Sequence, residues 1–298
     1  MFMPGITTME ENNLRIAVLS GKGGTGKTLV SVNLAASALQ STYVDCDVEE
    51  PNGHLYFKPV NPASREIAVK IPVVDEKRCN GCRVCVDFCK FNALAYVRGQ
   101  WKVFETVCHS CGGCVLFCPQ KALSEVEKPI GQIRAGLSEN VTVLTGILNT
   151  GETSGIPIIK ELLNIVANEK KLTVIDCPPG SACIVMESIK EADYCILVAE
   201  PTSFGVHNLA MVHELVSIFG KPCGVVLNKC LEGDNPAERY CLDRNLKILD
   251  RIPFDAEIGT LNSNGQILVR EHTKYWESFS TLLNSVIKEA RHAAITHS

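Results

Sequence analysis

A glycine-rich segment with the sequence GKGGTGKT, at residues 21–28, constrains the fold of this chain more than any other feature. It fits the pattern G-x-x-x-x-G-K-[ST], in which glycines let backbone N–H groups close around phosphate oxygens. An apolar run at residues 14–20 precedes it, and an amphipathic helical pattern at residues 28–40 follows it. The alternative is a glycine-rich turn that only connects the strand to the helix, but such a turn would not need to end in Gly-Lys-Thr. The motif and its position between a strand and a helix therefore predict a phosphate-binding loop.

The residue types in this loop predict how it would hold ATP with Mg²⁺. The N-terminus of the following helix adds a dipole that favours anions. Lys27 can reach the β and γ phosphate oxygens, and Thr28 can ligate Mg²⁺. The expected nucleotide site in the loop consists of Gly21, Lys22, Gly23, Gly24, Thr25, Gly26, Lys27 and Thr28.

Alternating apolar runs and helix-length segments predict the rest of the fold. Six further apolar runs lie at residues 42–45, 141–144, 172–176, 194–199, 223–228 and 247–252. This alternation is typical of an α/β fold in which helices cover both faces of a mostly parallel sheet. A closing amphipathic helix is expected at residues 280–293, where few positive charges accompany the leucines, so it should pack in the core rather than insert into a membrane.

The composition is that of an ordinary globular protein, with 46% hydrophobic and 21% charged residues. The formal net charge of −4 leaves no overall basic surface, which disfavours nucleic acid and anionic membranes as partners. Residues 1–13 have no apolar core of the kind that a signal peptide requires, and no stretch approaches ~18 uninterrupted apolar residues. We therefore expect a cytoplasmic protein.

Fifteen cysteines are unexpected, because a chain of 298 residues needs no disulfide staples and an odd number cannot pair completely. Eight of them form two runs with the same spacing, C-x2-C-x2-C-x3-C. Each cysteine of the second run lies 29 positions after its counterpart. The runs are Cys79, Cys82, Cys85 and Cys89, then Cys108, Cys111, Cys114 and Cys118.

This double run matches the bacterial ferredoxin pattern, in which three closely spaced cysteines hold one iron–sulfur cube and the fourth reaches the other cube. On that rule, two 4Fe-4S clusters are expected. One would be held by Cys79, Cys82, Cys85 and Cys118, and the other by Cys89, Cys108, Cys111 and Cys114. Zinc is the competing interpretation, since paired C-x2-C units also bind zinc. The repeated x2-x2-x3 spacing favours cubes over a tetrahedral ion.

The cysteine runs interrupt the strand–helix alternation, which predicts a second, small domain inserted into the first. We expect a nucleotide-binding domain whose first part is residues 13–72 and whose second part is residues 129–298, with a small α+β ferredoxin-type insert at residues 73–128. Prolines near both ends of the insert suit extended linkers. These are Pro59, Pro72 and Pro129.

Lys22, at the head of the loop, resembles the signature lysine of the deviant Walker A ATPases, the superfamily of MinD, ParA, Mrp and the nitrogenase iron protein. Two further segments are similar to the switch motifs of that superfamily: YVDCD at residues 43–47 and VIDCPPG at residues 174–180. The resemblance covers nearly all of the chain outside the insert. It implies a SIMIBI-class, MinD-like P-loop NTPase fold and ATPase activity.

The resemblance also implies roles for single residues. Asp47 would position the attacking water, Asp176 would hold Mg²⁺ through water, and Gly180 would sense the γ-phosphate. Segments 227–229 and 252–255, with Asn228 and Pro253, resemble those that surround the adenine. In these relatives ATP lies between two subunits, so Lys22 would cross to the nucleotide of the partner in a homodimer or in a heterodimer with a paralogue.

Seven cysteines lie outside the two runs, and most sit in or beside apolar segments, where a free cysteine packs as a small hydrophobe. Cys183 lies seven positions after Asp176, where the nitrogenase iron protein has a ligand of its subunit-bridging cluster. No second cysteine is found near residues 149–158, where the other ligand would be expected. We therefore expect Cys183 to be structural.

Three functions fit these features. The leading hypothesis is an ATP-dependent dimeric switch that couples ATP hydrolysis to electron transfer through the two clusters, with a redox partner protein that the sequence does not identify. The second is an iron–sulfur cluster assembly or carrier ATPase, as in Mrp-like relatives. The third is a positioning ATPase like MinD or ParA, which would need a membrane or DNA anchor.

Overall fold

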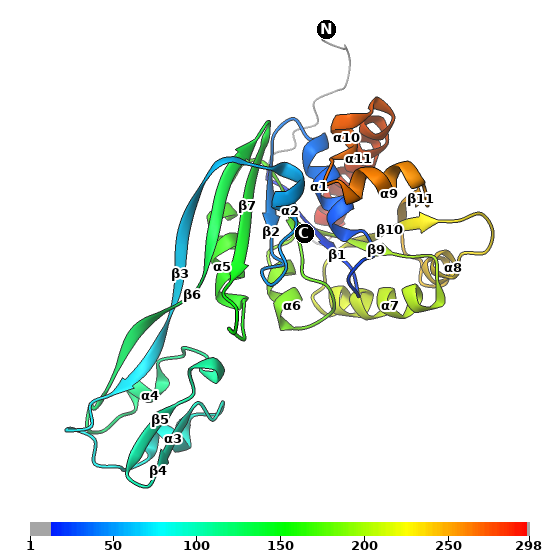
Figure 1. Ribbon diagram of the computed structural model, residues 1–298. Coiled ribbons are helices and arrows are strands. Elements are labelled where there is room, and N and C mark those ends of the chain that lie inside the picture. The colour runs from blue at the N-terminus through cyan, green and yellow to red at the C-terminus, as the bar shows by residue number, and fades with distance from the viewer. Residues whose placement is uncertain (1–12, 297–298) are drawn as a thin grey trace.

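The computed structural model describes residues 13–296, which form a large lobe and a small lobe joined by a long two-stranded ribbon (Figure 1). The large lobe contains a nine-stranded sheet with the order β11-β10-β9-β1-β8-β2-β7-β6-β3. Seven of these strands run parallel to one another. They are β1 (Arg15–Leu19), β2 (Ser41–Asp45), β7 (Val141–Leu148), β8 (Leu172–Asp176), β9 (Tyr194–Ala199), β10 (Cys223–Cys230) and β11 (Ile248–Pro253).

Each of these parallel strands overlaps one of the apolar runs expected from the sequence, so the prediction of a mostly parallel α/β sheet is confirmed. Side chains of a strand alternate between its two faces, so a strand buried on both sides is apolar throughout. In β1, Ile16 and Val18 join one hydrophobic cluster, whereas Ala17 and Leu19 join the other. The sheet thus separates two cores.

Helices cover both faces of the sheet. One core is closed by α1 (Lys27–Ser37), α10 (Leu268–Glu271) and α11 (Thr273–Thr296), with α2 (Gly53–Phe57) and α9 (Ala256–Ser263) beside them. The other is closed by α5 (Ile156–Val166), α6 (Cys183–Ile189), α7 (Ser203–Ile218) and α8 (Pro236–Asp243). The expected closing helix lies within α11, and Leu282, Leu283 and Val286 are buried in the first core, as predicted.

The segments expected to be extended linkers are extended strands that pair with each other, a pairing that the sequence analysis did not predict. The long strands β3 (Val60–Val74) and β6 (Leu123–Ser138) pair antiparallel from Val60↔Leu137 to Val74↔Leu123. The part of β6 nearest the large lobe also pairs with β7. Pro129 lies where the register shifts, because proline has no N–H to donate to the ladder. The ribbon therefore continues the main sheet at its edge.

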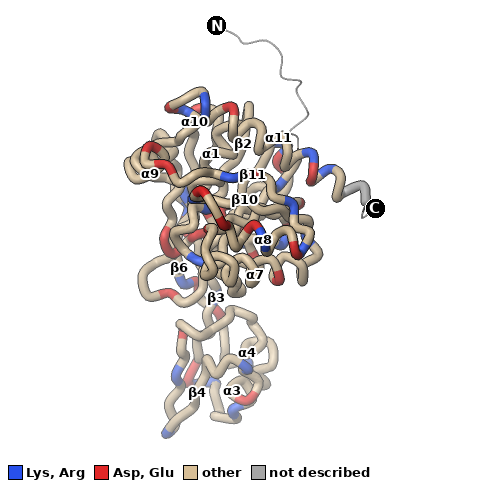
Figure 2. The backbone as a smooth tube through the Cα atoms, turned by 90° about the vertical axis from the view of Figure 1, so that its right-hand side faces the viewer, with Lys and Arg blue, Asp and Glu red and all other residues tan. Residues whose placement is uncertain are grey.

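The small lobe lies between the far ends of the ribbon. It contains α3 (Val84–Phe88), a hairpin of β4 (Leu94–Val97) and β5 (Gln100–Val103), the 3₁₀ turn η1 (Glu105–Val107) and α4 (Gly113–Leu116). Its own small core is formed by Cys85, Leu94, Cys114 and Leu123. Basic and acidic positions are interspersed along both lobes (Figure 2). No helix among residues 13–296 is long and apolar enough to cross a membrane.

We expect Leu162→Ala to lower the free energy of unfolding by about 2–5 kcal/mol, because Leu162 on α5 is fully buried and its loss leaves a cavity. The control is Leu39→Ala, at a side chain that is 71% exposed, which should change stability by no more than about 0.5 kcal/mol. Urea unfolding of the full chain measures both. Equal losses for the two variants would contradict the assignment of α5 to a packed core.

Candidate functional site

The predicted phosphate-binding loop, residues 21–28, joins β1 to α1: residues 20–26 connect the two elements, and Lys27 and Thr28 are the first residues of α1. Gly24 and Gly26 have φ values of 79° and 95°, which glycine adopts without strain. A Cβ on Gly26 would lie 2.0 Å from Nδ2 of Asn228, and this amide donates to the carbonyl oxygen of Thr25 at 2.7 Å. The loop thus requires glycine at position 26 and is held to β10 by Asn228.

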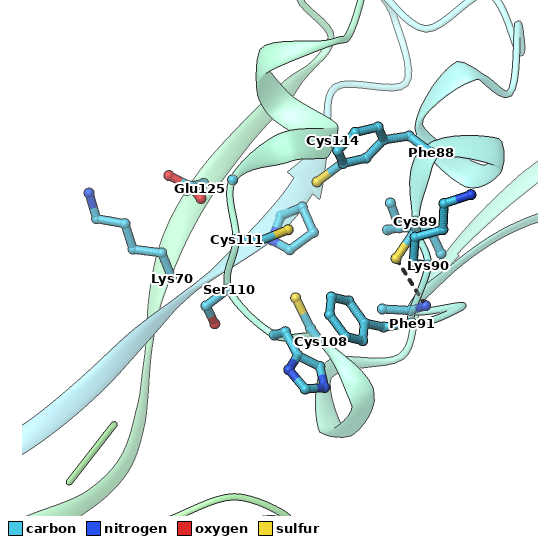
Figure 3. Close-up of a pocket in the computed structure, with 15 residues that line it drawn as sticks. Lys70, Phe88, Cys89, Lys90, Phe91, Cys108, Ser110, Cys111, Cys114 and Glu125 are labelled. Carbon is cyan, nitrogen blue, oxygen red and sulfur yellow. Dashed lines mark hydrogen bonds between the residues drawn. The ribbon is translucent and has the colours of Figure 1, made fainter. Parts of the chain in front are cut away.

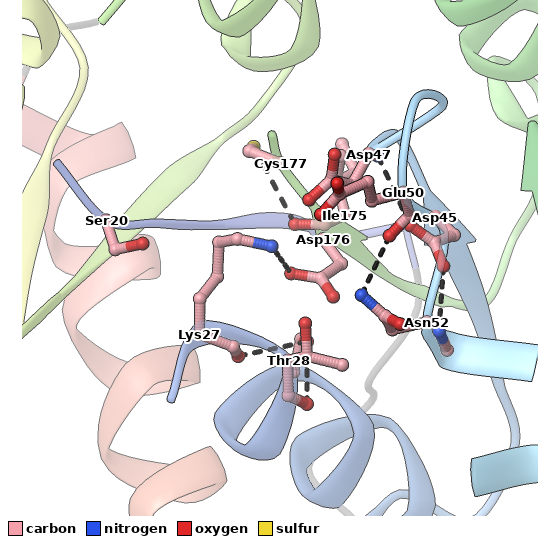
Figure 4. A network of polar contacts seen from close by, with 12 residues as sticks. Ser20, Lys27, Thr28, Asp45, Asp47, Glu50, Asn52, Ile175, Asp176 and Cys177 are labelled. Carbon is pink, nitrogen blue, oxygen red and sulfur yellow. Dashed lines mark hydrogen bonds and ion pairs between the residues drawn. The ribbon is translucent and has the colours of Figure 1, made fainter. Parts of the chain in front are cut away.

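Two buried charged side chains meet beside the loop (Figure 4). Lys27 Nζ donates to Asp176 Oδ1 at 2.7 Å, and the two residues are only 6% and 1% exposed. Tyr43 Oη donates to the other carboxylate oxygen of Asp176 at 2.8 Å. Burial lowers the pKa of Lys27, but the charge and hydrogen bond of Asp176 and the charges of Asp47 and Asp45 together outweigh it, and the pKa is raised overall. The contact joins the first residue of α1 to the last residue of β8.

Asp45, the last residue of β2, is a buried carboxyl group that the sequence analysis did not select. Its Oδ2 accepts from the Gly53 N–H at 2.8 Å, and its Oδ1 accepts from the Asp47 N–H at 3.2 Å. Burial and the neighbouring Asp176 raise the pKa of Asp45 to about 8. Asp45 therefore shapes the turn that carries Asp47. Its place at the end of an apolar strand was the signal that could have identified it.

A cavity of about 700 Å³ lies at the carboxyl ends of these strands. Predicted site residues that line it are Lys22, Gly23, Gly24, Gly26, Lys27, Thr28, Asp47, Asn228 and Pro253. Phe254, from the predicted segment 252–255, also lines it, and lining residues that the sequence analysis missed include Glu50, Asn52, Tyr56 and Asn262. Burial raises the pKa of Asp47 to about 6, against the opposing effect of Lys27. The arrangement brings a cation, hydroxyl groups and carboxyl groups to one side of a space large enough for a small-molecule ligand.

The remaining predicted nucleotide-site residues support this cavity from behind or from its edge. Gly180 N–H donates to the Ser20 carbonyl oxygen at 2.9 Å, which fixes the segment after β8 to the loop. A Cβ on Gly21 would lie 2.3 Å from the carbonyl oxygen of Asn208, so the loop packs closely on α7. Thr25 is buried, and its Oγ1 has no hydrogen-bond partner in the described part of the chain.

Lys22 is held within its own chain by Glu200, which the sequence analysis did not single out. Lys22 Nζ lies 2.6 Å from Glu200 Oε2 and 5.4 Å from the ring centre of Phe204. Lys229 Nζ contacts the same carboxylate at 2.7 Å and also donates to the Gly24 carbonyl oxygen at 2.7 Å. Burial tends to raise the pKa of Glu200, but the two ammonium groups outweigh it and the pKa is lowered.

The eight cysteines of the small lobe surround two separate cavities. One cavity, of about 320 Å³, is lined by Cys89, Cys108, Cys111 and Cys114, and Figure 3 shows their Sγ atoms facing a common space. The other, of about 10 Å³, is lined by Cys79, Cys82, Cys85 and Cys118. Each quartet combines three cysteines of one run with the fourth of the other. These are the two groupings that the spacing predicted.

Hydrogen bonds and burial set the chemistry of these thiols. Cys89 Sγ accepts from the Ala93 N–H at 3.4 Å, and Cys79 Sγ accepts from Trp101 Nε1 at 3.2 Å. Burial raises the pKa of Cys114 to about 11, so this thiol keeps its proton at neutral pH unless a metal displaces it. Cys-only quartets with N–H donors to sulfur fit the ligand set of an iron–sulfur cluster.

Two observations qualify the sequence predictions about metals. Among residues 13–296, no three His, Cys, Asp or Glu side chains are grouped so that they could hold a single metal ion. Cys183, expected to be a structural residue, is exposed at the first position of α6, whereas Cys46, Cys177 and Cys195 are buried as expected. The expectation for Cys183 failed because α6 begins at the surface and turns its buried face away from this position.

A family profile and several relatives match this chain. The profile described as the CbiA family, CobQ/CobB/MinD/ParA nucleotide binding domain, matches residues 16–269. An uncharacterized protein of Methanocaldococcus jannaschii is 32% identical over 90% of this chain and 95% of that protein. A protein of Methanococcus maripaludis named iron-sulfur cluster carrier protein is 24% identical over 95% of this chain and 87% of that protein.

Solved structures show the same fold. The cell division ATPase MinD of Pyrococcus furiosus superposes with a TM-score of 0.59 at 20% identity, covering 92% of this chain and 98% of that chain. The septum site-determining protein MinD of Pyrococcus horikoshii, complexed with Mg-ADP, gives a TM-score of 0.59 at 21% identity, covering 94% and 98%. At these identities the likeness concerns the fold alone.

We expect Asp45 to make the protein less stable as the pH rises. Its pKa is about 8 in the folded state, against an ordinary value of 3.8. Between these values the folded state binds the extra proton, so the contribution of this group is complete at low pH and is lost as the pH rises through about 8. Asp45→Asn, which stays neutral and keeps an acceptor oxygen, should therefore decline less in stability over this range.

Urea unfolding of the full chain at a series of pH values measures this difference. The control is Asp234→Asn, at a side chain that is 66% exposed, which should follow the pH dependence of the parent. Identical pH dependence for the parent and Asp45→Asn would show that Asp45 does not hold a proton in the folded state.

Proposed function

The chain belongs to the CobQ/CobB/MinD/ParA nucleotide-binding family, and on this premise we propose that it is a Mg²⁺-dependent, dimeric ATPase switch linked to one-electron transfer by two 4Fe-4S clusters. The observation that carries the proposal is that one chain combines a cavity built on a phosphate-binding loop with two cavities that are each lined by four cysteines. The insert at residues 73–128 is the proposed ferredoxin-type domain. Such thiols stay reduced in the cytoplasm, where we place the protein.

The proposed nucleotide site contains oppositely charged side chains that lie close together, Lys27 and Asp176. We assign Lys27 to the β and γ phosphate oxygens, because it is the buried cation at the start of α1. Thr28 and Asp176 would hold Mg²⁺, Thr28 directly and Asp176 through water. Asp47 lines the same cavity with its pKa raised to about 6, which suits a group that orients water and accepts a proton near neutral pH.

Dimer formation would give Lys22 its role. Lys22 lines the nucleotide cavity and is half-buried, and its present partner is Glu200 of the same chain. A second chain that brings its own Lys22 to this cavity would add a cation to the triphosphate in the way that an arginine finger does. The second subunit would be an identical chain or a paralogue, and the redox partner would be a separate protein.

The two cysteine quartets would hold the clusters as the spacing rule predicts: Cys79, Cys82, Cys85 and Cys118 for one, and Cys89, Cys108, Cys111 and Cys114 for the other. The chain supplies thiolates, the N–H donors of Ala93 and Trp101 toward sulfur, and an apolar surround. N–H donors of this kind stabilise the negative charge on the ligand sulfur and would thereby tune the reduction potential of the bound cluster.

A second function, the assembly or delivery of iron–sulfur clusters, is favoured by one observation: a relative covering most of this chain is named an iron-sulfur cluster carrier protein. In that case a cluster would be cargo and would leave the protein. The thiols of Cys85 and Cys114 are buried, which favours permanent ligands over transfer. Incubating the cluster-loaded protein with a cluster-free acceptor, with and without ATP, distinguishes the two functions. A positioning role like that of MinD would rest on the likeness in fold alone.

We expect Lys27→Ala to weaken binding of Mg-ATP by about 10- to 100-fold, because a charge-assisted contact to phosphate is lost. Asp47→Ala should spare binding and slow hydrolysis by about 10²- to 10⁴-fold. Lys22→Ala should abolish ATP-dependent dimerisation. Calorimetry, phosphate release and light scattering measure these three effects.

The matched control is Lys160→Ala, at an exposed lysine on α5, which should behave like the parent in all three assays. Circular dichroism checks that Lys27→Ala folds, since its buried partner Asp176 is left without a cation. A Lys22→Ala protein that dimerises and hydrolyses ATP normally would contradict a nucleotide site shared between subunits.

We expect about eight irons and a similar amount of sulfide per chain after anaerobic purification, because each cube takes four thiolates. Cys111→Ser should lose or degrade one cluster and leave about four irons. Cys195→Ser, at a buried cysteine of β9 outside both quartets, should keep both clusters. Stoichiometric zinc without sulfide in the parent protein would refute the ferredoxin assignment.

A further inference from the structure

The loop between β7 and α5, residues 149–155, contacts both segments that are proposed to respond to the γ-phosphate. At its start, Leu148 N–H donates to the carbonyl oxygen of Val48, the residue after Asp47, at 2.8 Å. At its end, a Cβ on Gly155 would lie 2.2 Å from a methyl group of Val48 and 3.3 Å from Cδ1 of Ile184, which follows the segment that begins at Asp176. The loop therefore packs against the residue that follows Asp47 and against α6, the helix that follows the segment beginning at Asp176.

The middle of the same loop contacts the small lobe, toward which it extends in Figure 1. Glu152 forms an ion pair of 2.9 Å with Lys128, which lies on the ribbon strand β6. Lys128 Nζ also lies 3.7 Å from Glu105 of η1, and Thr153 Oγ1 donates to the carbonyl oxygen of Thr106. The Lys128 and Glu152 side chains are 19% and 17% exposed, so solvent and salt screen this pair less than a surface pair.

The contacted part of the small lobe leads directly into one cysteine quartet. Glu105 and Thr106 belong to η1, and the Cys108 N–H donates to the Glu105 carbonyl oxygen at 3.2 Å. Cys108 lines the cavity of about 320 Å³ together with Cys89, Cys111 and Cys114. A displacement of η1 therefore moves a ligand of that quartet.

The other quartet connects to the large lobe through the ribbon and not through the loop after β7: the Cys79 N–H donates at 3.0 Å to the carbonyl oxygen of Asp75, the residue after β3. In the part of the chain that the structure describes, Cys79, Cys82, Cys85 and Cys118 make no hydrogen bond or ion pair to the large lobe. Their cavity is lined by Val74 and Leu123, the end residues of β3 and β6, and by residues between them, with no residue of the loop after β7. The two quartets thus differ in their mechanical contact with the nucleotide site, although their spacing in the sequence is identical.

We propose that Lys128, Glu152 and Thr153 form a latch that couples the nucleotide state to the Cys108 quartet and not to the Cys79 quartet. The proposal rests on the proposed function and names the residues that carry the coupling. When the segments at Val48 and Ile184 change position with the nucleotide, the loop shifts, and the latch passes the shift to η1. By linkage, reduction of that cluster must change the affinity for the nucleotide by the same factor, typically about 5- to 150-fold.

A second ion pair supplies a matched control. Arg65 on β3 and Glu161 on α5 also join the ribbon to the large lobe, at 2.6 Å, and within residues 13–296 no hydrogen bond or ion pair links either side chain to the small lobe. If the ribbon alone transmitted the nucleotide state, removing either pair would have similar effects. If the latch transmits it, only removal of the Lys128–Glu152 pair has an effect.

The test uses the full chain with both clusters, purified anaerobically, in four forms: the parent, Lys128→Met, Glu152→Gln and the control Arg65→Met. EPR-monitored titration with dithionite gives the midpoint of each cluster without nucleotide, with Mg-ADP and with a non-hydrolysable ATP analogue. Amide hydrogen exchange of residues 104–108 under the same conditions measures whether η1 responds to the nucleotide, independently of the cluster midpoint potentials. Iron analysis confirms that every variant retains both clusters.

We expect the analogue to shift the midpoint of one cluster and to change exchange at residues 104–108 in the parent and in Arg65→Met. Both effects should be lost in Lys128→Met and Glu152→Gln. Variants that keep both effects in full would overturn the latch, as would equal shifts of both clusters. An exchange response without any midpoint shift in the parent would support the latch and overturn redox coupling, which separates this proposal from the proposed function.

Discussion

The buried ion pair between Lys27 and Asp176 organises the nucleotide side of this protein. A lysine and an aspartate can be buried this deeply only because each neutralises the other, and removing either would leave an uncompensated charge in the core. The pair joins the start of α1 to the end of β8. Tyr43 completes the hydrogen bonding of Asp176, and the proximity of Asp176 helps keep the pKa of Asp45 high. This one electrostatic contact thus lies beside the buried carboxyl group that accepts the hydrogen bonds of the β2–α2 turn.

The insert follows β2, the strand that ends at Asp45 beside that contact. The chain leaves β2 directly after the buried carboxyl groups, runs out along β3 to the small lobe, and returns along β6 to pair with β7. Because β6 and β3 extend the main sheet, the small lobe is carried on hydrogen-bonded strands and not on free linkers. Paired strands transmit displacement better than flexible chain, whose ends move independently. The ribbon therefore holds the loop after β7 against η1.

The small lobe is too small to have an extensive core, and its cysteines belong to the little core that it has. Cys85 and Cys114 pack with Leu94 and Leu123, so the same side chains serve as core residues and as proposed ligands. Small domains of this kind usually need disulfides or metals for stability. We infer that loading of the clusters and folding of this lobe are coupled.

The sequence alone determined the local chemistry: the phosphate-binding loop, the seven parallel strands and the division of eight cysteines into two quartets follow from residue type and spacing, because each depends on neighbours in the chain. It did not reveal Asp45, the Glu200 contact of Lys22, the paired ribbon, or the latch of Lys128 with Glu152. These contacts form between residues that are distant in sequence and become neighbours only when the chain folds. The periodicity of a single segment contains no information about such neighbours. Spacing makes the two quartets identical, and only the tertiary structure distinguishes them, by placing one against the loop after β7.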